Sequence, residues 1–139
     1  MLTVRIADAS EVIPLRAAVL RPGRPVGDAV WVSDTLNDTK HWVAEQHDRI
    51  IGVATVVRAP FPDGDGPEWQ LRGMAVDSEC RSTGVGRQLL AQVMTDIDAP
   101  MWCNARIGAV AFYQRQGWRV ASAEFEVPTI GIHVRMVRP

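Results

Sequence analysis

Stretches in which apolar and polar residues alternate recur along the chain, and this period of two predicts β-strands. Together with β-branched apolar runs, the alternation predicts seven strands, at residues 2–6, 39–46, 50–57, 68–76, 101–104, 118–127 and 129–137. Helical spacing of apolar residues and helix-start signals predict helices at 10–20, 85–95 and 107–116. Residues 21–38 fit either a loop or a short fourth helix. We expect Ser10 to be the N-cap of the first helix and Gly117 to follow the end of the third.

Turn signals separate these elements. His47-Asp48-Arg49 is typical of a tight hairpin turn between two antiparallel strands, and residues 59–67, rich in Pro, Gly and Asp, predict a loop. Strands and helices mix along the chain without alternating strictly. We therefore expect an α/β fold of the α+β type, with a mixed, mostly antiparallel sheet and helices on its faces, rather than a doubly wound parallel sheet.

Composition narrows the class of protein. The chain has 139 residues, 47% hydrophobic and 22% charged, which fits one globular domain over residues 1–139. No apolar run approaches a membrane span, and the first residues lack the pattern of a secretory signal. Cys80 and Cys103 make neither a disulfide framework nor a metal site by themselves, so we expect reduced thiols in a cytoplasmic protein.

Charge argues against two kinds of partner. Fifteen Lys and Arg residues against sixteen Asp and Glu residues leave a net charge of −1. A chain that is nearly neutral has no overall field to attract a nucleic-acid backbone or an anionic membrane, so we expect neither as a partner.

The segment Arg81-Ser82-Thr83-Gly84-Val85-Gly86 is the main candidate for chemistry. It joins a predicted strand to a predicted helix, whose first N–H groups and dipole favour an anion such as pyrophosphate. A nucleoside-triphosphate loop of the Walker type is excluded because no Gly-Lys-Ser/Thr triplet is present, and the dinucleotide fingerprint lacks its third small residue. From this pattern alone, a tight loop without a ligand is as good an interpretation.

Arg81-x-x-Gly84-x-Gly86 resembles the pyrophosphate loop of the GNAT superfamily of acyl-CoA-dependent N-acetyltransferases. Leu71-Arg72-Gly73-Met74-Ala75-Val76, before the loop, resembles the strand that pairs with pantetheine in that family. Asn104-Ala105-Arg106, followed by Phe112-Tyr113 and Gly117-Trp118, resembles its second cofactor motif. The resemblance implies a GNAT-like sheet of about seven strands, with about four helices and with two central strands that splay apart around the pantetheine.

The resemblance also implies a reaction and a co-substrate. The enzyme would transfer an acetyl group from acetyl-CoA to the primary amine of a small-molecule acceptor, by direct attack on the thioester. The residues it implies in cofactor binding are Met74, Ala75, Val76, Arg81, Ser82, Thr83, Gly84, Val85, Gly86, Arg87, Asn104, Ala109, Phe112 and Tyr113.

Tyr113 matches the family's tyrosine that protonates the leaving thiolate. A phenol with a pKa of ~10 is protonated at neutral pH and donates a proton to a thiolate, whose conjugate acid has a pKa of ~8.5. The base is less clear, because Gln70 occupies the position of the usual glutamate. His133 is our candidate, and Glu68, Glu124 and an ordered water are alternatives.

The acceptor site is the part that the resemblance describes least. Alternation places Gln70, Arg72 and Met74 on one strand face, and Arg72 has the geometry to bind a carboxylate. Asp34 lies in the region where the family shapes its acceptor pocket. A CoA-binding module without catalysis and an enzyme acting on protein or peptide amines stay open as alternatives. A homodimer is also open, because family members often form dimers.

Overall fold

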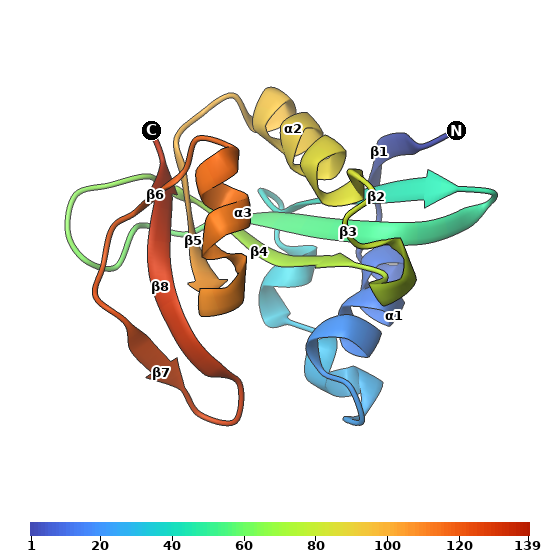
Figure 1. The fold of residues 1–139 in the computed structure, drawn as a ribbon, viewed down its shortest axis with the longest axis horizontal. Helices are drawn as coiled ribbons and strands as arrows, with labels where there is room; N and C mark the ends of the chain where they lie inside the picture. Colours follow the sequence, from blue (N-terminus) through green and yellow to red (C-terminus); the bar gives the residue numbers. More distant parts are fainter. The chain divides into compact units, whose positions relative to one another are not determined.

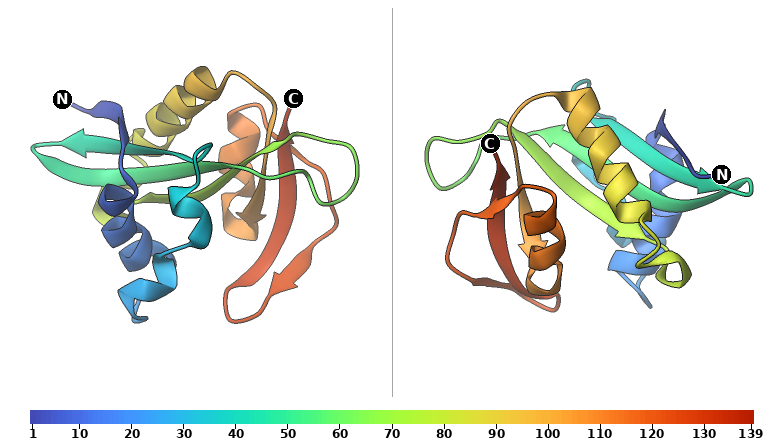
Figure 2. Two further views of the ribbon diagram at one scale, coloured as in Figure 1. Left: turned by 180° about the vertical axis from the view of Figure 1, so that it is seen from behind. Right: turned by 45° about the horizontal axis from the view of Figure 1, so that its top comes forward.

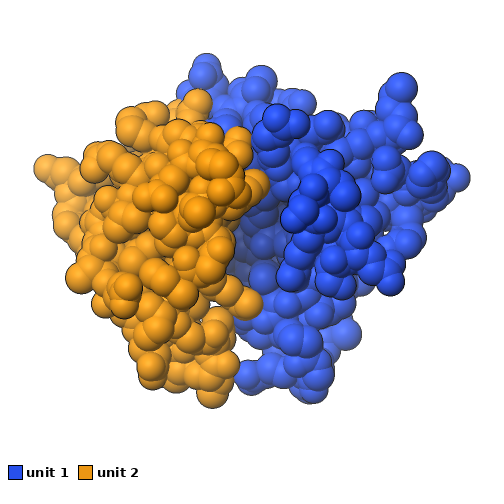
Figure 3. Space-filling model, in the orientation of Figure 1, with its two compact units in different colours: residues 1–57, 72–98 blue, residues 58–71, 99–139 orange.

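The structure, a computed structural model, describes residues 1–139. The chain forms two compact units (Figure 3). Unit 1 comprises Met1–Val57 and Arg72–Asp98, and unit 2 comprises Arg58–Leu71 and Ala99–Pro139. None of the helices combines the length and the apolar character that a membrane crossing requires.

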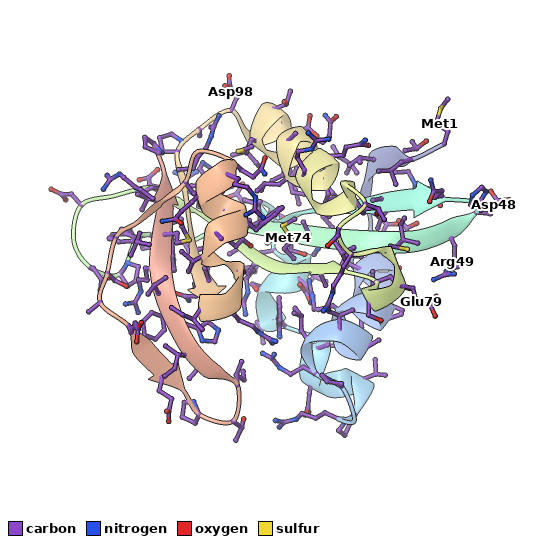
Figure 4. The ribbon with its side chains drawn as sticks, viewed as in Figure 1. Met1, Asp48, Arg49, Met74, Glu79 and Asp98 are labelled. Carbon is purple, nitrogen blue, oxygen red and sulfur yellow. The ribbon has the colours of Figure 1, made fainter.

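Unit 1 is built on an antiparallel sheet. β1 (Thr3–Ala7) pairs with β2 (Lys40–Gln46), and β2 pairs with β3 (Arg49–Arg58). Between β2 and β3, His47 and Asp48 both have positive φ angles, 54° and 59°. Two successive residues of this kind form the tight turn whose twist suits a hairpin. The turn projects at one end of the unit, where Figure 4 labels Asp48 and Arg49.

Two helices cover the two faces of this sheet (Figures 1 and 2). Val12 of α1 (Ala9–Leu20) packs in a cluster with Val43 and Val53, whereas Val85 of α2 (Val85–Ile97) packs with Ala44 and Ile51. Residues 43 and 44 are neighbours on β2 and therefore point to opposite faces. The alternating positions predicted from the sequence thus give the strand two buried faces, one packed against α1 and the other against α2.

The start of α1 differs from the sequence prediction. The N-cap is Asp8 rather than Ser10, and Glu11 lies at the third helical position. A Glu11 carboxylate oxygen accepts a hydrogen bond from the Asp8 backbone N–H at 2.9 Å. The Glu11 N–H in turn donates to the Asp8 carbonyl at 3.0 Å, so the two residues together fix the start of the helix. The ambiguous segment 21–38 forms two 3₁₀ turns, η1 (Val26–Ala29) and η2 (Val32–Thr35), rather than a fourth α-helix.

Unit 2 contains the strands that follow α2 and the first three residues of β4 (Trp69–Val76), whose other residues belong to unit 1. These three residues pair in parallel with β5 (Met101–Arg106), and β5 pairs antiparallel with β8 (Gly131–Arg138). β8 also pairs with β6 (Arg119–Val120) and β7 (Phe125–Val127). η4 (Ile107–Ala109) leads into α3 (Val110–Arg115), which follows β5 in the chain.

The observed strand order is β1-β2-β3-β4-β5-β8-β6, with β7 also on β8. The predicted class, a mixed and mostly antiparallel sheet with helices, is confirmed, although there are eight strands and three α-helices rather than about seven and about four. The predicted strand 118–127 is divided into β6 and β7. Between them the Ser122 hydroxyl accepts a hydrogen bond from the Arg135 N–H at 2.8 Å, so a side chain replaces the ladder there. The splaying of the central strands stays a prediction.

Candidate functional site: a glycine corner and a buried arginine network

The corner between β4 and α2 has the backbone geometry that the sequence predicts for an anion site. Ser82 and Gly84 have positive φ angles of 66° and 88°, and Gly84 is the N-cap of α2. No side chain caps this helix end. The first hydrogen bond of the helix runs from the Gln88 N–H to the Gly84 carbonyl at 3.0 Å. The preceding N–H groups therefore have no partner within the helix and suit an anion.

Hydrogen bonds anchor this corner to the sheet of unit 1. The Asp77 N–H donates to the Ile51 carbonyl at 2.8 Å, and the Thr83 hydroxyl donates to the Cys80 carbonyl. Cys80 ends η3 (Ser78–Cys80), a short 3₁₀ turn. The Asp77 carboxylate accepts from the Glu79 N–H at 3.0 Å and from Arg49 at 2.7 Å, and these bonds lower its pKa. Figure 4 shows Arg49 and Glu79 at this end of unit 1.

The side chains around the corner leave it open to solvent and positive in charge. Arg81, Ser82, Thr83 and Arg87 are exposed, whereas Val85 is buried and fixes the helix start to the sheet. A Cβ on Gly84 would meet only the Arg87 guanidinium, at 3.7 Å, so the glycine is required for its φ angle rather than for space. On β4, Ala75 is buried against α1, and Met74 is half-buried (Figure 4).

Tyr113, the predicted proton donor, is buried in unit 2. Its ring lies 5.2 Å from that of Phe112 and 5.4 Å from that of Trp118, centroid to centroid. Burial raises the pKa of Tyr113, and the Cys103 thiol raises it further. Cys103 is itself buried and its pKa is raised to about 12, which excludes a thiolate nucleophile near neutral pH. Ala109, one helical turn before Tyr113, is half-buried.

Asn104 and His133 lie on the neighbouring strands β5 and β8. Asn104 is exposed, and its register partner on β8 is Arg135. His133 is buried, and its ring stacks on Phe125 with 5.9 Å between centroids. Its Nδ1 lies 2.9 Å from the Gly131 carbonyl, which only accepts, so Nδ1 carries the proton. In the neutral ring, Nε2 then has the free lone pair that a base requires.

A buried polar network in unit 1 was not predicted from the sequence. Arg16 of α1 is fully buried, and its guanidinium binds both carboxylate oxygens of Asp34, at 2.8 and 3.0 Å. It also donates to the Ala29 carbonyl and to the Thr55 hydroxyl, each at 2.8 Å. His41 completes the network. Its Nε2 donates to the Asp34 carbonyl at 2.8 Å, and its Nδ1 faces the Thr55 hydroxyl at 2.7 Å.

The spacing of residues along α1 was the available signal for this network. Arg16 follows Val12 by four residues and therefore shares its face, which packs against the sheet. An arginine on the buried face of a helix requires a carboxylate nearby, since an unpaired buried charge is very costly. The sequence could have indicated a buried ion pair, although not which acid supplies it.

Arg72, the residue predicted to contact the acceptor, lies over the ring of Trp31, and Arg16 of this network lies over the same ring. The Arg72 guanidinium carbon lies 4.0 Å from the centroid of the Trp31 ring, and that of Arg16 lies 3.8 Å away. Gly73 allows the close approach, because its φ is +64° and a Cβ there would lie 2.9 Å from the Arg16 Nε. This Nε is buried without a hydrogen-bond partner.

Gly73 also interrupts the regular backbone of β4. Its φ of +64° lies outside the extended region on which strict alternation of side chains depends. The shared face of Gln70, Arg72 and Met74 stays a prediction.

The predicted site residues thus form groups within each unit. Unit 1 holds residues 81–87 at the glycine corner, and it brings Arg72 and Asp34 together around Trp31 and Arg16. Unit 2 holds Tyr113 with Phe112, and it holds Asn104 and His133 on adjacent strands. Gln70, also in unit 2, is half-buried and pairs with Trp102 of β5. The catalytic and binding roles of these residues are proposals.

Comparison with known proteins identifies the family. The chain is 24% identical over 143 residues to an uncharacterized N-acetyltransferase, YitI, of Bacillus subtilis, covering 99% of this chain and 96% of that protein. The crystal structure of Escherichia coli ElaA superposes with a TM-score of 0.82 at 21% identity, covering 100% of both chains. An acyl-CoA N-acyltransferase from Pseudomonas aeruginosa superposes at 0.78 with 17% identity, again over 100% of both chains.

These structural similarities show the fold. The family described as the acetyltransferase (GNAT) domain matches residues 29–138, which is most of the chain and includes the glycine corner, Tyr113 and His133. The chain therefore belongs to the GNAT family of acetyltransferases.

Proposed function

We propose that the protein is an N-acetyltransferase that transfers the acetyl group of acetyl-CoA to the primary amine of a small molecule. The observation that carries this proposal is the glycine corner at the start of α2. Positive φ angles at Ser82 and Gly84, an uncapped helix start and two exposed arginines suit the pyrophosphate of a CoA thioester. Cys80 and Cys103 are free thiols, in keeping with the reducing cytoplasm as the proposed location.

The reaction requires two proton movements. The amine nitrogen attacks the thioester carbonyl carbon, the C–S bond breaks, the amine loses a proton and the thiolate gains one. Tyr113 is the proposed donor to sulfur. Burial raises its pKa, so its hydroxyl stays protonated at neutral pH, the form from which it can donate to sulfur as negative charge develops there.

His133 is the proposed acceptor of the amine proton. Its Nδ1 donates to the Gly131 carbonyl, and this bond holds the ring with Nε2 unprotonated in the neutral form. Phe125, stacked on the imidazole, limits rotation of the ring. Gln70, at the position of the family's usual glutamate, has no basic atom for this task.

Thermal unfolding in the presence of acetyl-CoA tests the co-substrate. At about one hundred times its dissociation constant, a ligand stabilises the folded protein by ~2.7 kcal/mol, which raises the Tm of a chain of this size by several degrees. We expect such a rise with acetyl-CoA and none with ADP or NAD. CoA release with a panel of amines then tests the activity. A rise in Tm without turnover of any amine would favour the non-catalytic CoA-binding alternative, whereas no rise with any acyl-CoA would overturn the proposal.

A further inference from the structure

The residues around Trp31 carry more positive than negative charge. The charge of Arg16 is balanced by Asp34 at 2.8 Å. Arg72 has no carboxylate within ion-pair distance, and its one hydrogen bond, to the Ser33 hydroxyl, is long at 3.4 Å. Arg21, close enough to lower the pKa of Arg72, donates only to the carbonyl of its neighbour Leu20. Of these three arginines, only Arg16 forms an ion pair.

Asp34 has little capacity to balance a second arginine. One of its carboxylate oxygens accepts from Arg16 at 2.8 Å and from the Trp31 N–H at 2.9 Å, and the other accepts from Arg16 at 3.0 Å. The positive charge of Arg72 is therefore left for a group outside the protein to balance. Because Arg72 is partly buried, an unbalanced charge there costs more free energy than it would in water, and burial also lowers the pKa of Arg72.

The surroundings of Arg72 hold its guanidinium in place. Trp31, over whose ring the Arg72 guanidinium lies, is itself fixed by the hydrogen bond from its backbone N–H to Asp34 and by Arg16 at 3.8 Å from the ring centroid. The N–H groups of a guanidinium all lie in its own plane. In that plane, two parallel N–H groups match the two oxygens of a carboxylate.

We propose that Arg72 binds a carboxylate on the acceptor, so that the substrate is a small molecule carrying both a primary amine and a carboxylate, of the amino-acid type. Arg16, Asp34 and Trp31 act as positioning residues that hold the Arg72 guanidinium. This inference rests on the proposed acetyltransferase function and narrows its substrate class.

A matched panel of acceptors provides the test. Each set contains an α-amino acid, its amide and the corresponding decarboxylated amine, and phosphoethanolamine is added as a phosphate-bearing amine. Initial rates are measured for the wild type and for Arg72→Gln and Arg72→Lys. Arg58→Gln is the control, because Arg58 also lies over a tryptophan, at 5.5 Å from the Trp69 ring centroid, but is exposed and paired with Glu68.

We expect the wild type to prefer the carboxylated member of a set. Arg72→Gln should raise KM for that acceptor by roughly ten- to a hundredfold, the usual loss of affinity when charge-assisted hydrogen bonds are removed, with little change in kcat. It should leave the rate with the neutral amines and the rise in Tm with acetyl-CoA unchanged. Arg72→Lys should recover part of the loss, because it restores the charge without the planar fork. Arg58→Gln should behave as the wild type.

Other outcomes separate the two proposals. Equal or better turnover of neutral amines by the wild type would overturn the carboxylate assignment and leave the acetyltransferase function standing. Equal losses for neutral and carboxylated acceptors, or weaker acetyl-CoA binding in Arg72→Gln, would also overturn it. A preference for phosphoethanolamine would overturn the carboxylate assignment and indicate that Arg72 binds a phosphate on the acceptor instead. Absence of both an acetyl-CoA effect on Tm and any acetylation would overturn the function itself.

Discussion

The guanidinium of Arg16 binds both carboxylate oxygens of Asp34 where neither side chain reaches solvent, their exposed fractions being 0% and 2%. This pair connects α1 to the 3₁₀ turn η2 (Val32–Thr35), and through Thr55 it also connects both to β3. Because the Arg16 guanidinium lies against Trp31, the pair also supports the surface on which Arg72 rests. Stability and the proposed acceptor site therefore depend on the same ion pair.

Removing one partner of this pair is expected to destabilise unit 1 strongly. Asp34→Ala leaves the buried Arg16 charge without a counter-charge, which costs about 3–5 kcal/mol of unfolding free energy. Urea unfolding followed by circular dichroism gives the measurement. Asp28→Ala is the control, because Asp28 forms an exposed pair with Arg24, and such pairs contribute about 0–1 kcal/mol. Similar losses in the two variants would contradict this account of the network.

Acid stability provides a second prediction, on Glu11. Its hydrogen bonds with Arg5 and with the Asp8 N–H lower its pKa from 4.5 to about 2. A carboxyl whose pKa is lower in the folded than in the unfolded state stabilises the fold at pH values above its unfolded pKa. This stabilisation is lost as the pH falls toward its folded pKa. The free energy of unfolding of the wild type should therefore fall between pH 4.5 and 2, and Glu11→Gln should flatten part of this fall. Glu126→Gln, which removes an exposed carboxylate on β7, is the control for the loss of one negative charge.

At the glycine corner, Gly84→Glu should abolish the rise in Tm with acetyl-CoA. The substitution adds a negative charge at the proposed pyrophosphate position and strains a residue with a φ of +88°. Gly23→Glu is the matched control, since Gly23 also has a positive φ, +75°, and open space around it. The control should show the same modest loss of stability but the full acetyl-CoA effect. An unchanged acetyl-CoA effect in Gly84→Glu would exclude the corner as the binding site.

Tyr113→Phe tests the proton donor. The ring packing against Phe112 and Trp118 is kept, so we expect the fold and the acetyl-CoA effect on Tm to be kept as well. Turnover should fall by roughly 10²–10⁴-fold, the usual contribution of a positioned acid. Steady-state rates and the Tm with acetyl-CoA distinguish the two effects. A kcat close to that of the wild type would assign the donor role to another group.

His133→Gln tests the base. A neutral imidazole accepts the amine proton at Nε2, whereas a glutamine side chain has no basic atom for this task. In His133→Gln, kcat should therefore fall by roughly 10²–10⁴-fold, and the rise in Tm with acetyl-CoA should be kept. A kcat close to that of the wild type would mean that His133 only supports the packing of Phe125.

The sequence by itself determined the elements whose patterns are local. Alternation predicted β2 and β3 to within a residue or so, and helical spacing located α2, because each pattern reflects a face that must be buried. The tight loop from Arg81 to Gly86 and the helix start at its end were also readable, since glycine and a helix start act through the backbone nearby. The spacing of a motif singled out Tyr113, whose role as proton donor stays a prediction.

Only the tertiary structure decided which charges meet and why β4 has a glycine at position 73. Arg16 and Asp34 are eighteen residues apart, and Arg16 and Thr55 are thirty-nine apart, so no local pattern links them. Position 73 must be a glycine because a Cβ there would lie 2.9 Å from the Arg16 Nε. Packing is the reason in both cases. A buried arginine needs hydrogen-bond partners, and the packing of the elements, rather than position in the sequence, decides which groups lie close enough to it.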